Sequence, residues 1–142
     1  MSNYASLDDS ALTGMSWEEV ESYLSSVYKL EKRDNILRII LSYPNDNDRT
    51  QLVVVDHAQQ SDRLLVEITS RVGEIVPRRL DGALEKVAGM YFVGLVKMGD
   101  EYYVRMTLNM NYTPLEEVKK TISLVGGFAD DLEKEFVGGD EN

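Results

Sequence analysis

Cysteine is absent from this sequence of 142 residues, which holds only three prolines and one histidine. Without cysteine the chain forms no disulfide and offers no thiolate as a nucleophile or metal ligand, which suits a reducing cytoplasm. The longest apolar run, residues 90–96, is too short to span a bilayer. The first residues, MSNYASLDDS, have neither a basic region nor an apolar core. We therefore expect a cytoplasmic protein with no signal peptide and no membrane partner.

Basic residues are also few: 15 Lys and Arg stand against 25 Asp and Glu, which gives a formal charge of −10. Nucleic-acid binding depends largely on basic side chains that neutralise phosphates, so we expect no nucleic-acid partner. The acidity itself indicates solubility, and a specific basic partner is the alternative. With 43% hydrophobic residues, the composition and length are those of one globular domain with its own core.

Three segments of the chain differ in pattern. Residues 1–14 have no periodicity and collect Ser, Asp and Gly, so a flexible N-terminal arm is predicted there. Residues 15–137 are predicted to form a single α+β domain. Residues 138–142, GGDEN, are predicted to form an acidic disordered tail.

Apolar residues at spacings of three and four predict two helices in the first two thirds of the chain. The first begins at Ser16, which has the pattern of a capping box with Glu19, and ends near Tyr28. A charged turn is expected to follow it at residues 31–34. The second helix is predicted at residues 78–88.

Alternation of apolar and polar residues predicts five strands. The links between the first three are too short for parallel crossovers, so we expect an antiparallel meander followed by a hairpin. The apolar run 52–55 is expected to be buried on both faces, and residues 57–62 are expected to form a polar link. The predicted strands cover residues 35–43, 51–56, 63–70, 90–98 and 101–110.

The C-terminal segment carries the longest helical pattern. Thr113, Pro114 and Glu116 fit the N-cap, N1 and N3 positions of a helix that runs to about residue 136. One apolar stripe stays in phase along its whole length. The stripe consists of Leu115, Val118, Ile122, Val125, Ala129, Leu132 and Phe136.

Gly126 and Gly127 lie in the middle of this helix, where each costs about 1 kcal/mol relative to alanine. Burial of the apolar stripe contributes more, since side chains at about 1.5 kcal/mol each sum to ~10 kcal/mol as a gross upper bound. We therefore predict one helix, in which the glycines let another backbone come close. The stripe is expected to cover the protein's own sheet, and a coiled-coil seam between two chains is the alternative.

The element order α-β-β-β-α-β-β-α resembles the type III secretion chaperone-like superfamily and, within it, the YbjN-like bacterial proteins. The likeness rests on this order and on EYYVRMTLNM at 101–110 leading into TPLEEV at 113–118. It implies an α+β fold in which helices pack on a twisted antiparallel five-stranded sheet. It also implies a homodimer that binds protein segments and catalyses no reaction. Secretion chaperones lend a second helix and the neighbouring strand to the dimer, and they hold an extended segment of another protein on apolar patches.

Candidates for catalysis and metal binding are few. Asp56 and His57 are adjacent, and an enzyme site that they form with Arg63 is one hypothesis, although no nucleophile motif accompanies them. Residues 45–48, NDND, supply oxygen ligands without the spacing of a calcium-binding loop. The sequence has no glycine-rich phosphate loop, so we expect no cofactor, no metal and no catalytic residue.

The outward faces of the predicted strands mix apolar with charged side chains, although exposure to solvent favours polar ones. We therefore expect a non-enzymatic protein-binding module, a homodimeric adaptor, regulator or chaperone, whose partner is a protein or peptide segment. An enzyme with a site near Asp56 and His57 and a pure dimerisation module are the alternatives. The candidate partner-binding residues are Arg38, Ile40, Leu65, Glu67, Tyr103 and Arg105.

Overall fold

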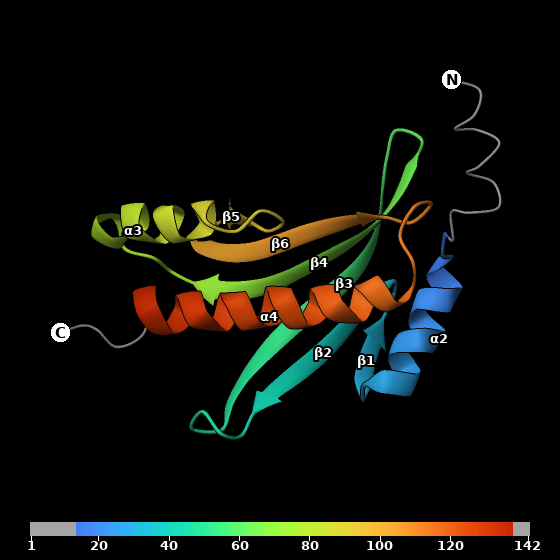
Figure 1. Cartoon of the computed structure of the whole chain (residues 1–142), viewed down its shortest axis with the longest axis horizontal. Helices are drawn as coiled ribbons and strands as arrows, with labels where there is room; N and C mark the ends of the chain where they lie inside the picture. Colours follow the sequence, from blue (N-terminus) through green and yellow to red (C-terminus); the bar gives the residue numbers. More distant parts are fainter. Residues whose placement is uncertain (1–13, 138–142) are drawn as a thin grey trace.

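The computed structural model describes residues 14–137, which form three helices and a six-stranded sheet (Figure 1). The tail predicted at residues 138–142, and all of the predicted arm except Gly14, lie outside the described residues. The elements, in chain order, are α2 (Trp17–Val27), β1 (Leu30–Arg33), β2 (Ile36–Tyr43), β3 (Arg49–Gln60), β4 (Arg63–Gly73), α3 (Pro77–Ala88), β5 (Gly94–Met98), β6 (Glu101–Asn109) and α4 (Glu116–Phe136).

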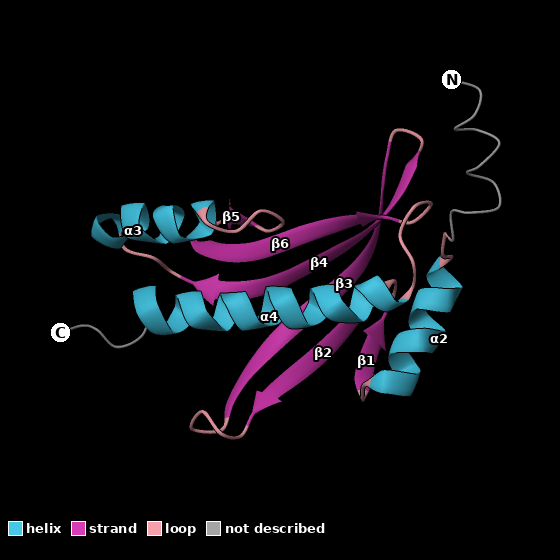
Figure 2. Cartoon of the chain, in the orientation of Figure 1, coloured by secondary structure: helices cyan, strands magenta, loops and turns pink. Residues whose placement is uncertain are grey.

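All strand pairs are antiparallel, and the strand order is β1-β2-β3-β4-β6-β5. Short turns explain why neighbours in sequence are mostly neighbours in space, and each of the four strand-to-strand turns uses a residue with positive φ: Asp34, Asn47 with Asp48, Ser61 and Gly99. The twisted sheet lies behind α4, which crosses it obliquely (Figure 2). The α+β class and the antiparallel sheet are confirmed.

The sheet has six strands, so the prediction of five is wrong. The additional strand is β1, in the segment predicted as a charged turn. Its sequence, LEKR, lacks an apolar alternation, but the strand pairs with β2 along its whole length, Leu30 packs against the core, and two of its charged side chains make ion pairs with other elements. Glu31 pairs with Arg38 on β2, and Lys32 pairs with Glu21 on α2. Cross-strand pairs of opposite charge stabilise a sheet without giving an apolar pattern.

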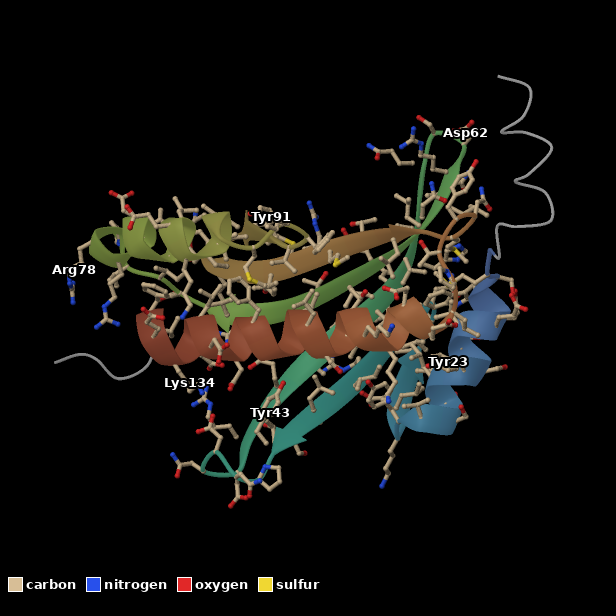
Figure 3. The ribbon with its side chains drawn as sticks, viewed as in Figure 1. Tyr23, Tyr43, Asp62, Arg78, Tyr91 and Lys134 are labelled. Atoms are coloured by element: carbon tan, nitrogen blue, oxygen red, sulfur yellow. The ribbon has the colours of Figure 1, made fainter. Side chains whose placement is uncertain are left out.

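The prediction of a polar link at residues 57–62 is also wrong, because β3 continues to Gln60 and β4 begins at Arg63. The two strands form a long hairpin that extends past the rest of the sheet, with Asp62 at its tip (Figure 3). The apolar run at 52–55 is not buried on both faces either. Val53 and Val55 are fully buried, whereas Leu52 and Val54 are only half-buried on the opposite face.

Other boundaries also differ from the prediction: β3 begins at Arg49 and β4 ends at Gly73, so both strands are longer than expected. β5 begins at Gly94, four residues later than predicted; Tyr91 and Phe92 before it are exposed, whereas Val93 is buried. α4 begins at Glu116 after the N-cap Leu115, which makes no side-chain cap, so the N-cap role predicted for Thr113 is wrong. A turn replaces that cap, since the amides of Glu117 and Val118 donate to the carbonyls of Pro114 and Leu115.

The prediction that α4 continues through its glycines is confirmed. Its apolar stripe is buried against the chain's own sheet, which rejects the coiled-coil alternative. A Cβ atom built on Gly126 would lie 2.5 Å from Cδ1 of Leu41 and 2.9 Å from Cγ2 of Val53. The prediction that the glycines let another backbone come close is therefore wrong: Gly126 makes room for side chains of β2 and β3, and a Cβ on Gly127 would meet nothing within 4 Å.

α2 begins as the sequence predicts, with a complete capping box. The hydroxyl of Ser16 accepts a hydrogen bond from the Glu19 amide at 3.1 Å, and the Ser16 amide donates to Glu19 at 2.9 Å. The cap fixes the helix start, so that Trp17, Val20 and Leu24 all face the core.

Candidate functional site: the open face of the sheet

The two faces of the sheet have different surroundings. The inner face is made by alternate strand residues such as Leu37, Val53, Ile68 and Val104, which are fully buried. α4 packs directly on this face against β3, β4 and β6, and α3 packs on α4. α2 belongs to the same layer, because its Trp17 ring stacks on the ring of His57, which lies on the inner face. The outer face is made by the other alternate residues, and within residues 14–137 no helix covers it.

All six candidate binding residues lie on this outer face. Arg38 and Ile40 come from β2, Leu65 and Glu67 from β4, and Tyr103 and Arg105 from β6. β3 separates the β2 pair from the other four, so the six do not form one cluster. Of the other four, Arg105 and Glu67 come together, as the Arg105 guanidinium lies 3.1 Å from the Glu67 carboxylate, whereas Tyr103 lies opposite Arg71. Ile40 is the most open of the apolar candidates, with 65% of its surface exposed.

Leu65, Glu67 and Arg105 line a hollow of about 610 Å³ beside the β3–β4 hairpin, which we call the hairpin hollow. Leu65 and Ala58 are cross-strand partners and give it an apolar wall. Arg63 stands at its hairpin end, and among the described residues it has neither an ion pair nor a hydrogen bond. The remaining lining residues are Gln59, Gln60, Thr107 and Asn109.

A second hollow of about 470 Å³ lies at the other side of the outer face, near β1. It includes Arg38 and Ile40, together with Leu52 of β3. The Arg38 Nε atom lies 3.2 Å from the Glu31 carboxylate, so its charge is neutralised within the face. The predicted residues therefore divide between two hollows, while Tyr103 lies outside both.

The charges of the outer face differ from those of the whole chain. Alternation and register place five basic and four acidic side chains on it, a net charge of +1 on a chain of −10. All five bases are arginines, although the chain contains seven lysines. The nine residues are Glu31, Arg33, Arg38, Asp56, Arg63, Glu67, Arg71, Glu101 and Arg105.

Several outer-face residues were missed by the sequence-based prediction. Arg71 pairs with Glu101 and lies opposite Tyr103, and Leu52 lies opposite Ile40. The alternation of apolar and polar residues in each strand already indicated that these side chains lie on the outer face. Their grouping depends on register and on the length of the β3–β4 hairpin, which the alternation does not supply.

The structure does not support an enzyme site at Asp56 and His57. Consecutive strand residues point to opposite faces, so Asp56 lies on the outer face and His57 on the inner face. The His57 ring stacks on Trp17 with 5.1 Å between ring centroids, and its Nε2 atom is buried without a hydrogen-bond partner among residues 14–137. Arg63 lies beyond the end of β3 at the hairpin. The three side chains therefore do not converge.

The oxygen-rich turn at residues 45–48 is part of an ion-pair network with α4. Lys134 donates to Asp46 at 2.7 Å, and this hydrogen bond lowers the pKa of Asp46 (Figure 3). Arg49 donates to Asp130, which is 3% exposed, at 2.9 Å. Within residues 14–137 no three His, Cys, Asp or Glu side chains are grouped to hold a metal ion. The network instead ties the turn to the last part of α4.

Comparisons with known proteins identify the fold only. No family model matches the sequence, and no curated protein matches it. Among solved structures the chain is similar to YbjN from E. coli, for which a role as a transcription regulator has been suggested. The TM-score is 0.53 and the identity 12%, over 88% of this chain and 93% of YbjN. The chain thus has a YbjN-like fold. No helix in the described part of the chain is long and apolar enough to cross a membrane.

Proposed function

We propose that this protein is a non-enzymatic, cytoplasmic module that binds another protein through the outer face of its sheet, as an adaptor, regulator or chaperone. The observation that carries the proposal is the uncovered outer face, on which apolar side chains alternate with arginines. An antiparallel sheet with one face in water usually shows polar residues there. Ile40, at 65% exposed, departs most clearly from that rule.

The composition of the outer face supports a protein partner. Arginine and tyrosine are enriched at protein interfaces and lysine is depleted, because a guanidinium loses less hydration and binds carboxylates with two hydrogen bonds. The outer strand positions follow this pattern, with arginines, Tyr103 and no lysine. The YbjN-like fold agrees with a regulatory role, and the resemblance to secretion chaperones suggests an extended segment as the bound form.

Affinity capture with matched variants tests the proposal. Ile40→Asp places a charge on the outer face, and Tyr112→Asp places one on an equally accessible residue, 59% exposed, beyond the end of β6. We expect the unmodified chain and Tyr112→Asp to capture the same protein. The amount captured by Ile40→Asp should be at least tenfold lower. Reconstitution with that purified protein should reproduce the difference. Equal capture by both variants would contradict the proposal.

A homodimer is the second part of the proposal, and the two edges of the sheet favour one geometry. Three of the four β1 residues are charged, which discourages pairing with another strand. β5 has a single charge, Lys97, and no proline or bulge. Just before β5, Tyr91 is 91% and Phe92 71% exposed, near α3 (Figure 3). We propose that β5 pairs with β5 of a second copy and that these aromatic rings are buried there.

Light scattering after size exclusion measures the mass directly. We expect a dimer for the unmodified chain and a monomer for the double variant Tyr91→Asp, Phe92→Asp. Tyr112→Asp, which also adds a charge at an exposed tyrosine, should remain a dimer. If the interface reaches the standard size of about 800 Å² per partner, the dimer should survive dilution to micromolar concentrations. A monomeric unmodified chain at about 0.1 mM would overturn the dimer and leave the outer-face proposal to its own test.

A further inference from the structure

The hairpin hollow contains a charge that the described chain does not neutralise. Arg105 is paired with Glu67, so the two cancel, and Arg63 leaves a net charge of +1 in the lining. Next to this charge lies the apolar pair Leu65 and Ala58. The hollow therefore fits a short segment in which an apolar side chain is followed by a carboxylate.

Such a segment exists in the same chain, and it begins beside the hollow. The amide of Met15 donates to the carbonyl of Met110 at 2.8 Å, and Asn109, the preceding residue, lines the hollow. Residues 1–13, MSNYASLDDSALT, contain two acids and no base. In an extended chain Asp9 lies five residues from Gly14, a reach of about 17 Å. The hollow spans only the neighbouring strands β3, β4 and β6.

We propose that residues 1–13 bind the hairpin hollow of their own chain, with Leu7 against Leu65 and the carboxylates of Asp8 and Asp9 at Arg63. Tethering makes a weak contact sufficient, because a short flexible link gives an effective concentration on the order of 1 mM. A segment whose free peptide binds at ~0.1 mM is then docked most of the time. The docked segment covers part of the outer face and competes with a protein partner for it.

Paramagnetic relaxation tests this proposal on the full chain, and the absence of cysteine permits a single label. A nitroxide on Ser6→Cys should broaden the amide signals of Leu65 and Glu67 in the ¹⁵N-labelled protein. Arg63→Glu should reduce that broadening at least twofold. Arg38→Glu, the same charge change on the same face but in the other hollow, should leave it unchanged. Equal broadening with Arg63→Glu would overturn the proposal.

Two further measurements separate the alternatives. Asp8→Asn with Asp9→Asn should reproduce the effect of Arg63→Glu, whereas Asp140→Asn with Glu141→Gln removes two charges elsewhere and should not. Mixing labelled, ¹⁴N chain with unlabelled, ¹⁵N chain detects binding between copies, and broadening of Leu65 and Glu67 there as strong as within the labelled chain would overturn docking within one chain. None of these measurements needs a partner protein, so their failure is distinct from failure of the proposed function.

Discussion

Gly126 and Gly127 provide a sharp test of how α4 lies on the sheet, because the two neighbours face opposite environments. Alanine at either position should gain about 1 kcal/mol of helix propensity. At Gly127 nothing opposes that gain, since a Cβ atom would meet nothing within 4 Å. We therefore expect Gly127→Ala to raise the free energy of unfolding by about 0.5–1 kcal/mol.

At Gly126 the added methyl group would overlap two side chains of the sheet. Val53 is fully buried and β-branched, so it moves little, while Leu41 is only partly buried and can change rotamer. Overpacking of this kind costs about 1–3 kcal/mol, which exceeds the propensity gain. We expect Gly126→Ala to lower the free energy of unfolding by about 1 kcal/mol, roughly 2 kcal/mol below Gly127→Ala.

Urea unfolding monitored by circular dichroism and by the single tryptophan, Trp17, measures both variants on one scale. Leu41→Ala should restore part of the loss in the Gly126→Ala background, because it removes the nearer of the two contacts. Equal stabilisation by both alanines would refute the close seating of α4 on β2 and β3. Destabilisation by Gly127→Ala would refute a continuous helix.

Other predictions concern the ion pairs. Asp130→Asn leaves Arg49 without its buried carboxylate, and we expect the free energy of unfolding measured in urea to fall by about 1–3 kcal/mol. The loss stays moderate because Arg49 is partly exposed and can be hydrated. Hydrogen bonds from Arg71 and Lys134 lower the pKa values of Glu101 and Asp46 below their ordinary 4.5 and 3.8. The two ionised carboxylates therefore stabilise the folded state at pH values above their ordinary pKa values. This stabilisation is lost as the pH falls through the lowered pKa values of the folded state. Thermal unfolding should show this loss below about pH 4.5, with a shallower loss for Glu101→Gln.

The sequence predicts best where one local pattern decides the structure. The stripe of α4 kept its phase across two glycines, and this phase correctly indicated one helix. The capping box at Ser16 was sufficient to define the start of α2. Both signals depend on residues within one or two turns of each other, so no information from distant parts of the chain is needed.

Prediction from the sequence failed where contacts between residues far apart in the chain determine the structure. β1 forms because β2 offers an open edge and because Arg38 and Glu21 pair with its charges. The segment at 57–62 is polar, yet it forms strand because β3 and β4 pair along their whole length. The candidate site had the same limit. Alternation gave the face of all six residues, but only strand order and register show that five of them divide between two hollows and that Tyr103 lies outside both.

The apolar run at residues 52–55 links this failure to function. The run predicts two covered faces, whereas the described chain covers one, so Leu52 and Val54 lie half-buried beside Ile40. Only the part of these three side chains that is still exposed can be buried in a complex, which would contribute about 1–2 kcal/mol each, or about 3–6 kcal/mol in total. Association costs at least about 4 kcal/mol, so the apolar residues alone give a weak complex. The arginines of the outer face must then supply much of the specificity, and we expect a partner that binds and leaves readily.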